Sequence, residues 1–173
     1  GKQKAEIVLA STEGKLPEVE GLKKVFDWPG EYEINDIPII GFPAWTKSRT
    51  KEEESGKAAD KTTIFCFIME GFKICHLGEL GHVLTSDMVK EIGDVDILMI
   101  KVGKESNLDL KKAREIIEAI EPRIVVPMGD GSAAGTLASD IGAEKTELQE
   151  KFTIKAASEL PEDKMKCVLL TKV

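Results

Sequence analysis

Residues 62–82 read TTIFCFIMEGFKICHLGELGH, and this stretch decides the fold. It contains two runs rich in β-branched and aromatic residues, Thr62–Met69 and Phe72–Leu77, joined by Glu70-Gly71. Two such runs around a Gly-containing dipeptide predict an antiparallel hairpin. The hairpin would deliver the residues that follow it to the end of a sheet.

Those residues are His76-Leu-Gly-Glu-Leu-Gly-His82, which hold both histidines of the chain. Gly78 and Gly81 let the backbone turn sharply and present Glu79 to whatever faces it. Imidazoles and carboxylates are the usual ligands of hydrolytic metal ions. The heptapeptide is therefore the first candidate for a functional site.

The rest of the chain alternates between apolar and polar segments. Further strands are predicted at residues 5–10, 25–27, 31–34, 37–42, 96–102, 124–127, 152–155 and 165–171. Helices are predicted between Thr85 and Gly93, from Asn107 or Asp109 to Pro122, and from Ser132 to Gly142. Residues 46–61 carry dense mixed charge without apolar periodicity, which predicts a flexible, solvated loop. This order of elements predicts an α/β (α+β) fold.

Composition limits the class of protein. The chain has 173 residues, 42% hydrophobic and 32% charged, which is typical of one soluble globular domain spanning 1–173. It is acidic, with a net charge of −7, which argues against nucleic-acid binding. Cys66, Cys75 and Cys167 lie in apolar runs without a CxxC spacing, so we expect buried thiols in a reducing compartment. No signal peptide or membrane-spanning segment is found, so we expect a cytoplasmic protein without membrane contact.

Four co-linear blocks resemble a known family. They are WPGEYEIND at 28–36, the hairpin at 62–82, GDVDILMIKVG at 93–103 and IEPRIVVPM at 120–128. Together they resemble the metallo-β-lactamase-fold hydrolases, and within them the small bacterial Zn-dependent hydrolase branch. The resemblance implies a four-layer αβ/βα sandwich, with two mixed sheets face to face and helices outside. It also implies that this chain lacks one or two strands with which that branch begins.

The family's histidines and aspartates hold one or two zinc ions that activate a water molecule. Residues that cannot ligate zinc stand at most of the positions that the resemblance assigns to ligands: Thr12, Gly14, Leu16, Pro17, Thr46 and Gly129. Glu79 is the only ligand-type residue at a ligand position, and Asp130 follows the last one. We therefore expect no zinc and assign no catalytic residue; Glu79, His82 and Asp130 remain the candidates for weak metal binding. The implied vestigial cleft consists of Thr12, Gly14, Trp45, Thr46, His76, Glu79, His82, Gly129 and Asp130.

Several of these residues also have a purely structural interpretation. His76 and His82 can be hydrogen-bonding groups of the loop, and Asp130 can be a turn residue before a helix. The segment 129–135, GDGSAAG, only weakly resembles a phosphate-binding loop. Trp28 is expected to pack at a turn, whereas Trp45 is a candidate to line a cleft.

The function predicted from these observations is a non-catalytic binding or assembly subunit, which forms a homo-oligomer or joins an active homologue. The alternative is a metal-dependent hydrolase with a site rebuilt around His76, Glu79, His82 and Asp130. A third hypothesis is a subunit whose missing strands are supplied by a partner, because uncovered sheet edges recruit strands.

Overall fold

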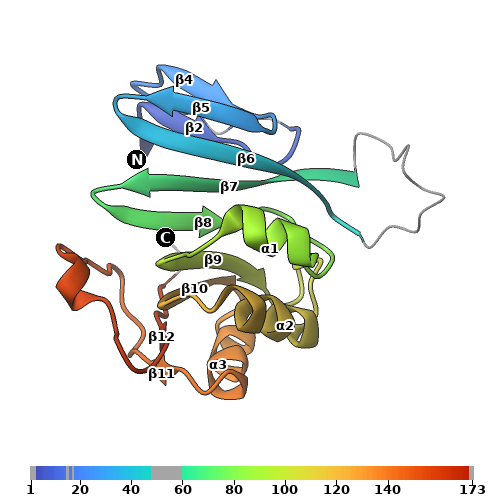
Figure 1. The fold of residues 1–173 in the computed structure, drawn as a ribbon, viewed down its shortest axis with the longest axis vertical. Coiled ribbons are helices and arrows are strands. Elements are labelled where there is room, and N and C mark those ends of the chain that lie inside the picture. The colour runs from blue at the N-terminus through green and yellow to red at the C-terminus, as the bar shows by residue number, and fades with distance from the viewer. Residues whose placement is uncertain (1–2, 15, 17, 48–59, 172–173) are drawn as a thin grey trace.

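The centre of the molecule is one large mixed sheet (Figure 1). The structure, a computed structural model, describes residues 3–14, 16, 18–47 and 60–171. Eight strands follow the order β11-β12-β10-β9-β8-β7-β6-β5. The α/β class predicted from the sequence is confirmed.

One half of this sheet is an antiparallel meander. Its strands are β5 (Gly30–Ile34), β6 (Ile37–Trp45), β7 (Lys61–Met69) and β8 (Phe72–His76). Two-residue turns at Asn35-Asp36 and Glu70-Gly71 close two of the hairpins, and all four residues have positive φ. Such turns match the twist of paired strands, and Asn, Asp and Gly adopt this conformation most readily. The predicted hairpin at 62–82 is confirmed.

The other half is parallel and carries the helices. Strands β9 (Ile97–Val102), β10 (Ile124–Gly129), β12 (Lys166–Cys167) and β11 (Glu144–Lys145) continue the sheet from β8. Helices α1 (Ser86–Ile92), α2 (Leu110–Ile120) and α3 (Gly131–Asp140) lie between them in the chain. The helices cover one face, because their buried side chains join a single cluster with those of the strands. No helix within the described ranges has the length and apolarity needed to cross a bilayer.

The opposite face is covered by both ends of the described chain. Strands β2 (Ile7–Leu9) and β4 (Lys24–Phe26) pair in parallel, as do β1 (Gln3–Lys4) and β3 (Val19–Glu20). Phe26 packs with Ile39 and Phe65 of the meander in a second cluster. Leu160, just after the 3-10 turn Ala157–Glu159, joins a third cluster under the parallel half. Apolar cores therefore lie on both sides of the large sheet.

Two strands predicted from the sequence need correction, and a predicted loop cannot be compared. Residues 152–155 form no strand; Phe152 and Ile154 instead pack on the third cluster from an irregular segment. The strand predicted at 165–171 is limited to Lys166–Cys167. The predicted loop at 46–61 is described only at its ends, and residues 48–59 lie outside the described residues.

Candidate functional site

The strand ends and loops that carry the predicted site residues meet at one edge of the large sheet. Strands β6, β8, β9 and β10 run in the same direction, because β6 and β8 both oppose β7 while β8 to β10 are parallel. The Gly81 amide donates to the Trp45 carbonyl oxygen over 2.9 Å. The Glu79 amide donates to the Thr62 hydroxyl over 3.1 Å. The loop 77–82 is therefore fastened to the neighbouring strands.

Thr62 ties this loop to the one that follows β2. Its side chain is buried, and its hydroxyl donates to the Ser11 carbonyl oxygen over 3.0 Å. The Thr63 amide donates to the same oxygen over 2.8 Å. A Cβ at Gly78, which has a φ of 61°, would lie 2.7 Å from the Thr62 hydroxyl and 2.8 Å from the Ser11 Cβ. A side chain at residue 78 would therefore collide with both neighbours, and glycine is required there. The absence of a side chain lets the loop 77–82, strand β7 and the loop after β2 meet this closely.

The neighbours of the Glu79 carboxylate are a cation and an amide. The Lys101 ammonium group lies 2.7 Å from Glu79 Oε1. The Asn107 amide nitrogen donates to the Glu79 carbonyl oxygen over 3.0 Å and reaches Oε2 at 3.4 Å. Both side chains of the ion pair are about 30% exposed. Sequence reasoning missed Lys101 and Asn107, although Lys101 is the only charged residue within the apolar strand β9.

The two histidines are held by main-chain groups. His76 Nδ1 accepts a hydrogen bond from the Gly78 amide at 3.0 Å. Burial lowers the pKa of His76, although the negative charge of Glu79 acts in the opposite direction. His82 Nε2 accepts from the Trp45 amide at 3.3 Å, so its Nδ1 carries the proton and donates to the Val83 carbonyl oxygen at 2.8 Å. Both ring nitrogens of His82 are therefore already in use.

Asp130 begins a helix. Its carboxylate accepts from the Ser132 amide at 2.8 Å and caps α3. The helix therefore begins two residues earlier than the cap predicted at Ser132, because Asp130 is an equally good capping residue. Gly129 has a φ of 114°, and a Cβ there would lie 2.5 Å from the Val102 carbonyl oxygen. This geometry agrees with the structural interpretation of Asp130.

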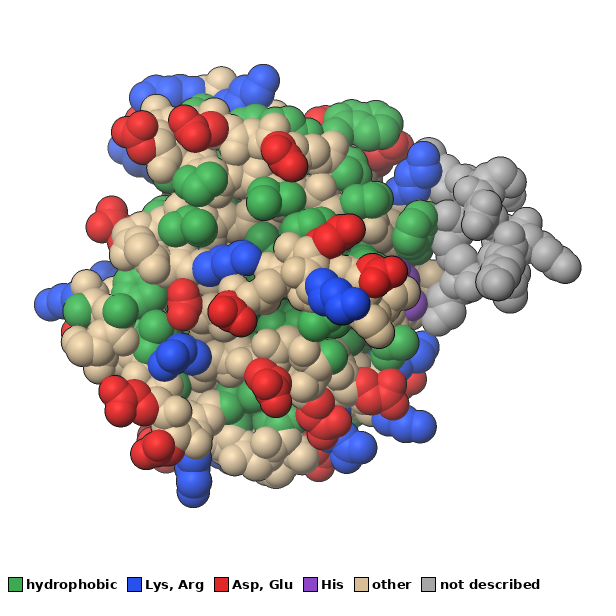
Figure 2. All heavy atoms as spheres, viewed as in Figure 1, with side chains coloured by type: hydrophobic (Ala, Val, Ile, Leu, Met, Phe, Trp, Pro, Cys, Tyr) green, Lys and Arg blue, Asp and Glu red, His purple; other side chains and the backbone are tan. Residues whose placement is uncertain are grey.

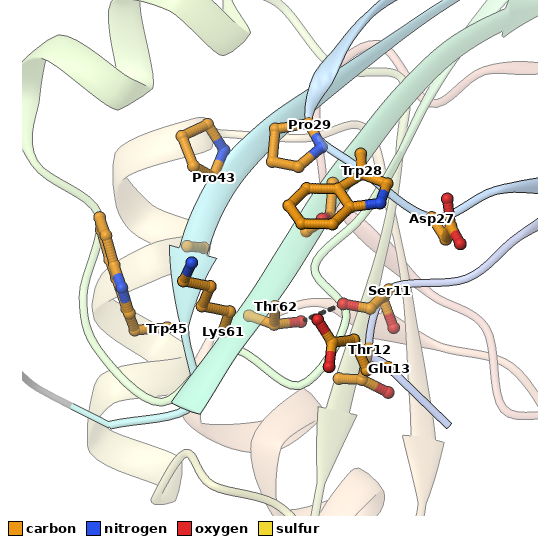
Figure 3. A pocket seen from close by; sticks show the side chains of 12 residues that line it. Ser11, Thr12, Glu13, Asp27, Trp28, Pro29, Pro43, Trp45, Lys61 and Thr62 are labelled. Atoms are coloured by element: carbon orange, nitrogen blue, oxygen red, sulfur yellow. Dashed lines mark hydrogen bonds between the residues drawn. The ribbon is translucent and has the colours of Figure 1, made fainter. Parts of the chain in front are cut away.

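A pocket of about 320 Å³ opens beside these segments (Figure 3). Thr12 and Trp45, both predicted cleft residues, line it together with Trp28, which sequence reasoning had placed at a turn. Trp28 does lie at a bend, but its side chain is 61% exposed rather than packed. Two other predicted cleft residues, Thr46 and Gly14, do not line this pocket. The Thr46 amide donates to the Asp60 carbonyl oxygen, and Gly14 is exposed. Pro17 lies outside the described residues.

The fold family implies zinc, and the donor atoms described above do not form a zinc site. A catalytic zinc takes three protein ligands and keeps one position open. Within residues 3–14, 16, 18–47 and 60–171, no three His, Cys, Asp or Glu side chains are grouped so that they could hold a metal ion. Glu79 is paired with Lys101, and His82 and Asp130 are bonded to main-chain groups.

The mixed sheet, its helical layer and the loops that meet at the ends of β6 and β8 define an α/β protein of the metallo-β-lactamase type. Comparison with known proteins agrees: residues 2–129 match the model of the β-lactamase superfamily domain. The chain belongs to this superfamily.

Relatives with similar sequences are named as hydrolases or by family alone. A UPF0173 protein of Pyrococcus furiosus is 30% identical over 150 residues, which cover 85% of this chain and 63% of the relative. A UPF0173 metal-dependent hydrolase of Thermococcus onnurineus is 27% identical over 100 residues, covering 57% of this chain and 43% of the relative. The chain thus spans about half the length of these relatives.

Solved structures support the same fold. A Thermotoga maritima protein assigned as a Zn-dependent hydrolase of the metallo-β-lactamase superfamily superimposes with a TM-score of 0.70. It is 26% identical, and the match covers 98% of this chain and 84% of that one. A Parabacteroides distasonis protein assigned as a metal-dependent hydrolase superimposes with a TM-score of 0.57 and is 16% identical. That match covers 97% of this chain and 76% of the Parabacteroides chain.

Proposed function

We propose that this chain is a member of the metal-dependent hydrolase family that has lost the hydrolytic zinc site and serves as a non-catalytic binding subunit. The observation that carries this proposal is the pairing of Glu79 with Lys101 and Asn107. Glu79 is the one ligand-type residue at a position where the resemblance expects a ligand. Its carboxylate already has a positive partner within the protein.

The ammonium group of Lys101 opposes metal binding at Glu79. A cation bound by Glu79 would have to displace Lys101 or lie close to a like charge in a half-buried site, where such repulsion is poorly screened. His82 could help only after giving up its hydrogen bond from the Trp45 amide. Asp130 would have to leave the helix cap at Ser132. Each candidate ligand therefore has a competing structural role.

Metal analysis of the full chain, purified without chelators and dialysed against Zn²⁺ or Mn²⁺, tests this proposal. We expect far less than one metal ion per chain, unchanged in Glu79→Gln. Glu118→Gln on α2 is the matched control, since Glu118 is exposed and far from the loop in sequence. One tightly bound zinc per chain that is lost in Glu79→Gln and retained in Glu118→Gln would refute the proposal.

Activity measurements address the rebuilt hydrolase. A panel of lactone, ester and phosphodiester substrates is incubated with the chain, with and without added Zn²⁺ or Mn²⁺. We expect no turnover above that of the His82→Ala variant. Turnover that disappears in His82→Ala, with the fold retained by circular dichroism, would favour the hydrolase instead.

An assembly role is supported by the short strand pairs on the second face. β2 and β4 pair over only three residues, in parallel, and the apolar side chains of Ile7, Val8 and Leu9 are only partly buried. Parallel sheets normally have both faces covered, and isolated two-stranded sheets are marginal in water. A second copy or a homologous subunit that adds a strand here would bury these side chains.

Light scattering after size-exclusion chromatography tests the assembly role. We expect a mass above 18.9 kDa for the chain alone or after mixing with an active homologue. A Val8→Lys variant should shift the mass to that of a monomer. A monomer under both conditions, with the metal analysis unchanged, would restrict the role to ligand binding.

A further inference from the structure

Both tryptophans of the chain line the pocket beside the vestigial cleft (Figure 3). Trp28 and Trp45 lie on opposite sides of it, and Pro29 and Pro43 add flat apolar surface. The volume of about 320 Å³ is at the lower end of the range for small-molecule sites. These walls suit a flat apolar group, because aromatic rings stack on indole faces.

Contacts to the main chain at both tryptophans order the segments that carry the indoles. The Tyr32 hydroxyl donates to the Trp28 carbonyl oxygen over 2.9 Å. Gly41 lets β6 approach the same turn, since a Cβ there would lie 3.1 Å from that oxygen. Trp45 is fixed through its amide to His82 and its carbonyl to Gly81. A main chain that is ordered before binding reduces the entropy lost when a ligand binds. The side chain of Trp28 is 61% exposed and leaves apolar surface for a ligand to cover.

Charges of both signs surround these walls. Lys61 lies on the Trp45 side of the pocket and Asp27 on the Trp28 side, and Glu13 also lines it (Figure 3). All three side chains are exposed, and no ion pair joins them to another residue in the described part of the chain. A ligand that matches this pattern carries one negative and one positive group. A polyanion would be repelled by the two carboxylates, and a simple cation would leave the Lys61 ammonium group without a partner.

We propose that this pocket binds a small aromatic zwitterion of the α-amino-acid class. The ring lies between the walls of Trp28 and Trp45, the carboxylate meets the Lys61 ammonium group, and the ligand's ammonium group faces Asp27 and Glu13. This inference rests on the proposed binding role of the chain and names the class of ligand.

Quenching of the intrinsic fluorescence tests the inference directly, because the only two tryptophans are at the pocket. The full chain is titrated with L-4-nitrophenylalanine, a non-fluorescent quencher. Two analogues accompany it: 3-(4-nitrophenyl)propionate, which lacks the ammonium group, and 2-(4-nitrophenyl)ethylamine, which lacks the carboxylate. We expect saturable quenching, strongest for the zwitterion. Quenching that does not saturate, or an equal Kd for zwitterion and either analogue, would overturn the proposal.

Variants assign the charges. Lys61→Gln should raise the Kd of the zwitterion and of the acid by about two- to fivefold, the range expected of exposed ion pairs, and leave that of the amine unchanged. Asp27→Asn should do the same for the zwitterion and the amine. Lys151→Gln is the control and should change no affinity, because Lys151 is exposed and does not line the pocket. Unchanged affinities in both pocket variants would refute the assignment.

Metal analysis of the same samples separates this inference from the proposed function. A zinc-bearing chain that binds the zwitterion selectively would refute the loss of zinc and support the ligand class. A zinc-free chain that does not bind it would refute the ligand class alone.

Discussion

The Lys101 ammonium group lies 2.7 Å from the Glu79 carboxylate, although the two residues are 22 positions apart in the chain. Glu79 belongs to the loop 77–82 and Lys101 to strand β9. The pair lies at the sheet edge where the resemblance expects a metal ligand. A fixed positive charge of the protein thus occupies the immediate surroundings of that carboxylate.

Lys101 and Glu79 should be energetically coupled. In a double-mutant cycle with Lys101→Met and Glu79→Gln, we expect a coupling free energy of about 1–2 kcal/mol, because the pair is half-buried and charge-assisted. The exposed pair of Lys111 and Glu115, at 4.0 Å, is the control and should give about 0.3–0.5 kcal/mol. Urea denaturation measures both cycles. Equal coupling in the two pairs would contradict the importance of the Lys101 contact.

Gly81 should not tolerate a side chain. A Cβ there would collide with the Thr46 carbonyl group, so we expect Gly81→Ala to lower the free energy of unfolding by about 1–3 kcal/mol. Gly135→Ala is the control: Gly135 lies inside α3 with no atom near its Cβ position, so alanine should stabilise by about 0.5–1 kcal/mol. Thermal unfolding shows whether each variant is less or more stable than the wild type. A neutral Gly81→Ala would mean that the loop 77–82 can move away from β6.

His76 should make the stability depend on pH. Burial lowers the pKa of His76 in the folded protein, whereas in the unfolded chain it is near 6.5. As the pH falls through 6.5, the unfolded chain therefore binds a proton that the folded protein does not, and the free energy of unfolding decreases. The decrease ends below the folded pKa. Between about pH 7.5 and about pH 5, the free energy of unfolding should therefore decrease less in His76→Asn than in the wild type.

His82→Asn is the companion variant for that measurement. Its comparison with the wild type separates the effect of His76 from any general effect of acid on the carboxylates. Parallel pH profiles of the wild type and His76→Asn would contradict the role assigned to His76.

The three thiols should be unreactive in the folded state. Cys66 and Cys75 are direct partners across β7 and β8, and all three cysteines are buried. The hydrogen bond with the Cys66 thiol and burial raise the pKa of Cys75, and burial raises that of Cys167 to about 11. Because the thiolate is the reactive form, an aromatic disulfide reagent at mildly alkaline pH should label no thiol until denaturant is added. Rapid labelling of the native protein would contradict this burial.

The sequence predicts the antiparallel half of the sheet well because the signals there are local. Glu70-Gly71 joins two apolar runs, and both residues adopt the positive φ that the turn requires. Thr85 and Asp109 are capping residues at the beginnings of α1 and α2, as their side chains suggest. The predicted strand at 152–155 fails because Phe152 and Ile154 satisfy the core without pairing to a neighbouring strand.

The candidate site is less predictable because its contacts are long-range. Proximity to the ends of strands identifies Glu79, His82 and Trp45 as residues of one edge, and hydrogen bonds at this edge link all three loops. The partner of Glu79 is a lysine, which a search for metal ligands passes over. Trp28 is assigned to a turn from its neighbours Pro29 and Gly30, and nothing local indicates that its ring is exposed toward a pocket.

The order of strands in the large sheet also has a consequence for how the chain folds. Strands β5, β6, β7 and β8 are neighbours in the sheet in the same order as in the chain, whereas β12 lies between β10 and β11. Contacts between sequence neighbours close with less loss of chain entropy than distant ones. The meander is therefore expected to form in the folding transition state, with the parallel half and its helices joining afterwards. Substitutions at Phe65 should slow folding, and those at Leu137 of α3 should mainly accelerate unfolding.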